Sequence, residues 1–62
     1  MNQQLVTIRA ILLDVERLTS QSAVYYDQDP SLAIRNMTLA EAKVNQAKAA
    51  ISKFLETDHT RS

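Results

Sequence analysis

Apolar side chains in the second half of the chain recur at alternating steps of four and three residues. They are Ala40, Val44, Ala47, Ile51 and Phe54. This spacing keeps the side chains on one face of an α-helix and is typical of a helix that packs against another. Thr38 followed by Glu41 has the sequence of a capping box, in which both side chains accept hydrogen bonds from unpaired amides of the first turn. The pattern therefore predicts a packed helix over about residues 39–57.

The first half of the chain predicts another amphipathic helix, over about residues 3–26. Its apolar side chains recur mostly at steps of three or four residues, at Leu5, Ile8, Ile11, Leu12, Val15 and Leu18. Asn2 is placed to cap the amino end of this helix. Residues 19–22 are all polar, with middling or poor helix propensity, so the helix either continues through them or bends there. Continuation is favoured, because residues 23–26 would otherwise form an exposed apolar loop.

The two helices are connected by a polar segment that ends in the single proline. Asp29 is expected to cap a new helical segment, with Pro30 at the first position, where the missing N–H is not needed. We expect a short helical turn over about residues 30–35, after which residues 36–38 begin the long second helix. That helix has no glycine or proline at its end, and residues 58–62 are predicted to form a loose tail.

The absence of glycine restricts the fold class. The 62 residues include no Gly, no Cys and one Pro, whereas hairpin turns between strands need residues with positive φ. The prediction is one all-α domain, residues 1–62, folded as an antiparallel two-helix hairpin with a short helical corner. A core of this size supplies only about 3–5 kcal/mol without a disulfide or metal. We therefore expect oligomerisation or a partner chain to complete it.

The main apolar stripes of the two helices, with Leu55 added to the second, are expected to face each other. Further apolar and small residues then remain on other faces, where small side chains would let another helix approach closely, and the two corner tyrosines are large amphipathic anchors. The predicted partner interface consists of Val6, Leu13, Val24, Tyr25, Tyr26, Leu39, Ala42, Ala49 and Ala50. Alternatively, these are ordinary exposed apolar residues, and the tyrosines cover Leu32 and Ile34. If the predicted interface is used, Leu13→Asp is expected to abolish association and leave the helix content largely unchanged.

Residues that could support catalysis are few. His59 is the only histidine and falls in the predicted tail, where a general base would lack a rigid pocket. Asp27 and Asp29 lack the further oxygen ligands, the glycine and the terminal glutamate of a calcium-binding loop. Asp14 and Glu16 would project in different directions from a helix. We predict that the protein is not an enzyme and has no catalytic, cofactor-binding or metal-binding residues.

The charges of the chain favour a protein partner over nucleic acid. Seven basic and seven acidic residues give a formal net charge of zero. Lys43, Lys48 and Lys53 step by five residues, so they are spread around the helix and do not form a basic strip. No apolar run reaches the roughly 18 residues of a membrane span, and the amino end lacks the features of a signal peptide. A cytoplasmic protein without a membrane span is expected.

One pattern in the second half of the chain resembles a known family. The residues that carry it are Asp29, Pro30, Asn36, Leu39, Glu41, Ala42, Gln46, Ala47 and Ile51. They resemble the carboxyl-terminal half of the small co-chaperones of bacterial type III secretion, which are cysteine-free helical hairpins; residues 24–27 have no counterpart there. The resemblance implies a cytoplasmic bacterial co-chaperone that pairs with a second chaperone to hold a needle subunit soluble.

The length and hairpin layout also resemble those of Rop, in which two hairpins form a four-helix bundle that binds RNA. This second resemblance implies the alternative function, a homodimeric regulator that acts on RNA or DNA. In that arrangement a symmetric dimer would bring Arg9 and Arg17 of both chains together.

Overall fold

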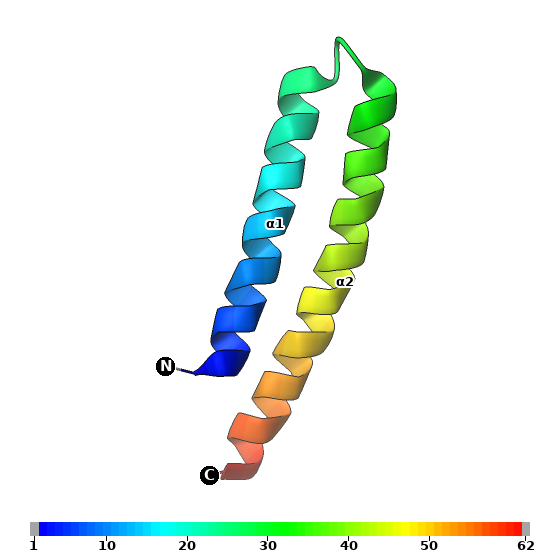
Figure 1. The fold of residues 1–62 in the computed structure, drawn as a ribbon. Helices are drawn as coiled ribbons and strands as arrows, with labels where there is room; N and C mark the ends of the chain where they lie inside the picture. The colour runs from blue at the N-terminus through cyan, green and yellow to red at the C-terminus, as the bar shows by residue number, and fades with distance from the viewer. Residues whose placement is uncertain (1, 62) are drawn as a thin grey trace.

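The chain folds into two antiparallel helices joined by a tight turn. The computed structural model describes the backbone of residues 2–61 and the side chains of residues 2–57. Helix α1 spans Gln3–Tyr25 and helix α2 spans Pro30–Arg61, and the two lie side by side along the whole of α1 (Figure 1). No strand occurs within the described residues. The predicted all-α helical hairpin is therefore confirmed.

Helix α1 begins at a capping residue and continues through its polar segment. The Asn2 side-chain oxygen accepts a hydrogen bond from the Leu5 amide at 3.1 Å. Within residues 19–22, the hydroxyl oxygens of Thr19 and Ser22 lie 3.0 and 2.8 Å from the carbonyl oxygens of Val15 and Leu18, one turn earlier. Hydroxyl groups that bond to the preceding turn are compatible with a continuous helix. The predicted continuation of the first helix is thus confirmed.

The turn reverses the chain without glycine. The amides of Gln28 and Asp29 both donate to the Tyr25 carbonyl, at 3.1 and 2.8 Å, which satisfies one of the free carbonyl groups at the end of α1. Throughout the described residues, no φ angle is positive. Asp29 then accepts a hydrogen bond from the Leu32 amide at 3.1 Å, as expected of a residue that caps a helix beginning at Pro30.

Helix α2 is longer than the sequence patterns predict. The predicted short turn over residues 30–35 is the first part of α2, so the helix does not begin again near residue 39. The Thr38 hydroxyl donates to the Ile34 carbonyl at 3.0 Å, which is an interior bond and not a cap. Residues 36–38 contain no helix breaker, and Ala33 is already buried against α1 before them. The helical backbone also continues through residues 58–61, where a loose tail is predicted.

The core between the helices is narrow, and small side chains dominate it on the α2 side. The buried apolar residues are Ile8, Leu18, Ala33, Ala40 and Ala47. The three alanines are seven residues apart, which is the repeat of a coiled-coil contact line. Alanine at the contact lets two helix backbones approach closely. The buried Ser22 hydroxyl, 3.4 Å from the Ala33 carbonyl of the other helix, agrees with this close approach.

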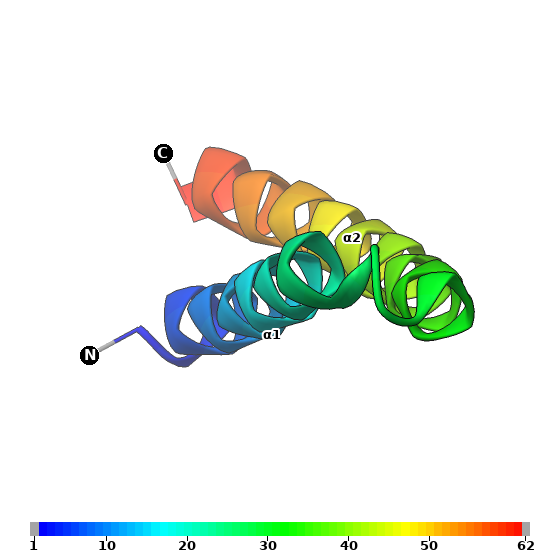
Figure 2. The same cartoon turned by 90° about the horizontal axis from the view of Figure 1, so that it is seen from above.

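Close packing leaves part of the predicted core outside the contact line. Val44 and Ile51 are 38% and 39% exposed, and Leu55 is 62% exposed, although all three belong to the predicted facing stripe of the second helix. On α1, Leu5 and Leu12 are also about half exposed. Figure 2 shows that the two helices form a single layer, so each helix has one helical neighbour. The layer has two broad sides, and these apolar residues lie toward one of them.

Candidate protein-interaction face

One broad side of the hairpin is polar. Lys43 of α2 lies 3.3 Å from the carboxylate of Asp14 on α1, and Arg17 lies 3.8 Å from the same carboxylate. About two turns closer to the connection, the Asn36 amide donates to the Gln21 side-chain oxygen at 3.4 Å. Polar groups of the two helices therefore pair across the contact line on this side, which we call the polar side.

The opposite side carries an open groove between the helices. The groove has a volume of about 910 Å³ and occupies the half of the hairpin nearest the turn. It is lined by Val15, Thr19, Ser22, Ala23, Tyr26, Ala33, Ile34, Met37, Thr38, Ala40, Glu41 and Val44. Apolar atoms make up most of its surface. A concave apolar surface of this kind is suited to receive apolar side chains from another molecule.

The apolar side extends beyond the groove along the whole hairpin. Residues seven apart occupy nearly the same angular position on a packed helix. Leu5 and Leu12 therefore share the position of Tyr26, while Ile51 shares that of Val44 and Met37. Leu55 likewise shares the position of Ile34. We define the apolar face as Leu5, Leu12, Tyr26, Ile34, Met37, Val44, Ile51 and Leu55.

The exposure of the apolar face is large for a chain of this size. Its eight side chains are between 38% and 63% exposed. Full burial of a large aliphatic side chain contributes about 1.5–3 kcal/mol, so burying the exposed part of each would contribute about 1 kcal/mol. The summed gain is comparable with the stability of an isolated small hairpin. Burial of this face against another molecule would therefore provide a large favourable free energy of association.

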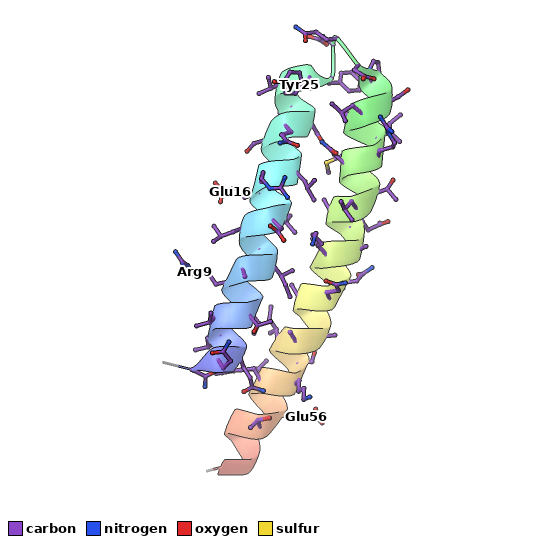
Figure 3. All side chains as sticks on the ribbon, in the orientation of Figure 1. Arg9, Glu16, Tyr25 and Glu56 are labelled. Atoms are coloured by element: carbon purple, nitrogen blue, oxygen red, sulfur yellow. The ribbon has the colours of Figure 1, made fainter. Side chains whose placement is uncertain are left out.

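Charged residues border the apolar face along the outer edges of both helices. Arg9 and Glu16 project from the same side of α1, away from α2 (Figure 3). They are seven residues apart, and Ala23, which lines the groove, follows Glu16 by another seven. On α2, Glu41 lies at the groove and Lys48 follows it by seven residues, so both lie on the outer line of the apolar face, between Ile34 and Leu55. All four are exposed, and none forms an ion pair with another described residue. An apolar centre with a charged border is the usual composition of a protein–protein interface.

The predicted second apolar line of α1 lies elsewhere. Val6, Leu13 and Val24 are 37%, 48% and 68% exposed, and none of them lines the groove. Val6 and Leu13 share the angular position of Ser20, while Val24 shares that of Arg17 beside the polar side. These residues form a separate surface on the outside of α1, and the structure does not join them to the apolar face.

The remaining predicted interface residues are divided among several surfaces. Leu39 is exposed, and Ala42 and Ala49 share the angular position of Glu56, which projects from α2 away from α1 (Figure 3). Ala50 is half-buried and lines a small pocket with Gln3, Gln4, Thr7 and Lys53.

The two corner tyrosines have different surroundings. Tyr26 is 57% exposed and lines the groove together with Ile34, whereas Tyr25 is 45% exposed and does not line it. Leu32, which the alternative interpretation places under the tyrosines, is half-buried. Of the predicted interface residues, Tyr26 is thus the one that belongs to the apolar face.

Sequence reasoning missed the apolar face because it assigned that face to the core. Val44 and Ile51 each follow an alanine of the buried line by four residues, and periodicity alone places both lines on one broad stripe. The seven-residue repeat of Met37, Val44 and Ile51, parallel to that of the alanines, is the signal that separates the two lines. A narrow contact between two helices can bury only one of them.

The structure also locates the polar residues considered as catalytic or metal-binding candidates. Asp29 caps α2, and Asp14 pairs with Lys43. Within the described residues, no three His, Cys, Asp or Glu side chains lie close enough to hold a metal ion. The side chain of His59 lies outside the described residues. In the part of the chain that the structure describes, neither helix contains a segment long and apolar enough to cross a bilayer.

Comparison with known proteins adds no relative. No family model matches the chain, and neither the curated proteins nor the solved structures contain a match to it.

Proposed function

We propose that this protein is a non-catalytic interaction module that buries its apolar face against helices of another chain. The observation that carries the proposal is the gathering of eight large, half-exposed apolar side chains on one side of a two-helix layer, with paired polar groups on the other. Such one-sided exposure on a small protein marks an interaction site.

Helices are the natural ligands of this face. It is long and narrow, follows the helix axes within a molecule whose longest extent is 51 Å, and has ridges at a seven-residue repeat. Amphipathic helices present apolar residues at a matching repeat and pack along such a surface to form a three- or four-helix core. The hairpin contributes half of a bundle, and the bound chain contributes the rest.

The more specific form of the proposal is a small co-chaperone of the type III secretion kind. The support for it is the residue pattern of the second half of the chain, together with a helical hairpin that has an apolar face. In this role, the face would cover apolar helix surface of a partner and keep that partner soluble in the bacterial cytoplasm. Tyr26 at the groove is the side chain best placed to anchor such a partner.

Photo-crosslinking in the native cells tests the proposal. A photoreactive phenylalanine analogue is introduced at Val44, within the apolar face, or at Gln46, an exposed residue that shares the angular position of Leu39 and so lies away from the groove. We expect protein adducts from position 44 that are absent from position 46, with the attached peptides mapping to helices. Equal labelling from both positions, or no protein adduct from position 44, would overturn the proposal.

The same experiment separates the proposal from the nucleic-acid alternative. A bundle that acts on RNA or DNA would give nucleic-acid adducts or nuclease-sensitive complexes that dissociate as salt is raised. The structure weakens this alternative, because Lys43 and Arg17 lie beside the Asp14 carboxylate. Salt-sensitive nucleic-acid complexes without protein adducts would favour it over a co-chaperone.

A further inference from the structure

The charges that border the apolar face form two bands of opposite sign. Asp14 and Lys43 are in contact and so lie at the same level of the antiparallel hairpin. Five residues away along each helix, Arg9 lies level with Lys48; two residues in the other direction, Glu16 lies level with Glu41. The hairpin therefore has a positive band near the open end and a negative band nearer the turn. Seven residues separate the bands, which is about 10 Å along a helix.

A second copy can cover the apolar face in two symmetric ways, and these charges distinguish them. With both turns at the same end, α1 would lie on α2 of the second copy. Arg9 would then meet Lys48, and Glu16 would meet Glu41, so that like charges oppose each other at every border position. With the turns at opposite ends, each helix lies antiparallel to its own counterpart. Arg9 then meets Glu16 of the second copy, and Glu41 meets Lys48.

A single twofold axis makes both sets of pairs. Arg9 is level with Lys48, and Glu16 is level with Glu41. The midpoint between Arg9 and Glu16 on α1 is therefore level with the midpoint between Glu41 and Lys48 on α2. One axis through this level, perpendicular to the helices, therefore forms four ion pairs in the dimer. Charges that are complementary at four border positions specify orientation and exclude the alternative arrangement.

The apolar residues of α2 have the same symmetry. About this axis, Ile34 meets Leu55 of the second copy, Met37 meets Ile51, and Val44 meets its own counterpart. On α1, Leu12 likewise meets its counterpart. Apolar residues thus oppose apolar residues along α2, where the ridges of the two copies interdigitate as in a coiled coil.

The surface area of the hairpin agrees with a second copy. The chain exposes 4984 Å² for a mass of 7.0 kDa, whereas a compact monomer of this mass exposes about 4,000 Å². The excess of about 1,000 Å² is close to the roughly 800 Å² that each partner buries in a standard stable interface.

We infer that the apolar face binds a second copy of this chain, with the two turns at opposite ends of a four-helix bundle. This inference rests on the general form of the proposed function, in which the apolar face is buried against helices of another chain. It names a second copy as that chain, in place of the different partner that a co-chaperone would hold.

Charge reversal on α2 tests the orientation. Glu41→Lys and Lys48→Glu each replace two attractive pairs of the dimer with two repulsive ones, and we expect each to raise the dimer dissociation constant about tenfold or more in low salt. The double variant restores opposite charges and is expected to return to within about threefold of the unchanged protein. Sedimentation equilibrium gives the constants. Tighter association of either single variant, or additive weakening in the double variant, would contradict the arrangement.

Disulfide formation tests the position of the axis independently of charge. The chain has no cysteine, so Val44→Cys introduces a single thiol beside the expected axis. Gln46→Cys, at an exposed position away from the groove, is the matched control. We expect rapid oxidation of the first variant to a covalent dimer with retained helix content, and slow oxidation of the control. Purified protein that remains monomeric while position 44 crosslinks to a different protein in cells would refute the second copy and leave the proposed function intact.

Discussion

Single polar side chains determine where the two helices begin. Asn2 and Asp29 each accept a hydrogen bond from the amide three residues later, and each lies at the amino end of a helix. Pro30 follows Asp29 at a position where its ring favours helical φ and its missing N–H has no intrahelical partner. These short-range interactions depend on neighbouring residues only, which is why both caps can be predicted from the sequence.

Asp29→Ala is expected to destabilise the fold by about 1 kcal/mol, because an amide of the first turn of α2 loses its side-chain acceptor. The measurement is urea unfolding followed by circular dichroism at a fixed protein concentration. Asp27→Ala, an exposed carboxylate in the same turn, is the control and is expected to change the stability by less than about 0.5 kcal/mol. Equal losses from the two variants would show that Asp29 contributes only charge.

At the scale of the helices, the alanine line of α2 controls how the hairpin packs. Ala33, Ala40 and Ala47 are the most deeply buried residues of this helix, although their side chains are the smallest available with a β-carbon. Their burial brings the backbones close together, and the larger Val44 and Ile51 are consequently displaced to one side. The apolar face therefore follows from the small size of the residues beside it.

Ala47→Leu is expected to destabilise the hairpin by about 1–3 kcal/mol, since three extra carbon atoms must enter a closely packed contact line. Ala49→Leu places the same side chain on an exposed position of the same helix and is expected to have little effect on the unfolding free energy. Thermal unfolding followed by circular dichroism compares the two variants. A stable Ala47→Leu protein would mean that the helices are further apart than described here.

Thr38→Ala examines the continuity of α2. Thr38 lies in the helix interior, where alanine has the higher propensity, so the substitution is expected to leave stability unchanged or raise it by up to about 0.5 kcal/mol. A residue that capped a helix would instead lose about 1 kcal/mol. A loss of stability as large as that of Asp29→Ala, measured in the same way, would support the capping box predicted at this position.

At the scale of the whole molecule, the hairpin has two unlike sides. Polar groups on one side connect the helices through Asp14 with Lys43 and Gln21 with Asn36, and the other side exposes the apolar face. Two adjacent leucines can be used to distinguish the two candidate interfaces. Leu12 belongs to the apolar face, whereas Leu13 belongs with Val6 and Val24 to the surface on the outside of α1. Their side chains are 46% and 48% exposed, so substitutions at the two positions remove similar amounts of buried apolar surface from the hairpin itself.

Leu12→Asp is expected to abolish association, because it places a charge within the buried centre of the interface. Leu13→Asp is expected to leave association nearly unchanged. Sedimentation velocity over a concentration series reports association, and circular dichroism checks that both variants keep their helix content. The opposite result, with loss of association only in Leu13→Asp, would assign the interface to Val6, Leu13 and Val24.

Local patterns in the sequence were sufficient to predict two helices, an antiparallel hairpin, the caps at Asn2 and Asp29, and a continuous first helix. Each depends on hydrogen bonds or side-chain periodicity within a few residues. The length of α2 was mispredicted because a capping-box pattern at Thr38 also occurs inside helices, where the hydroxyl bonds to the preceding turn. Which apolar residues form the core was decided only by the tertiary structure. The alanine line and the Met37–Val44–Ile51 line share one stripe, and the close approach of α1 buries the first and exposes the second.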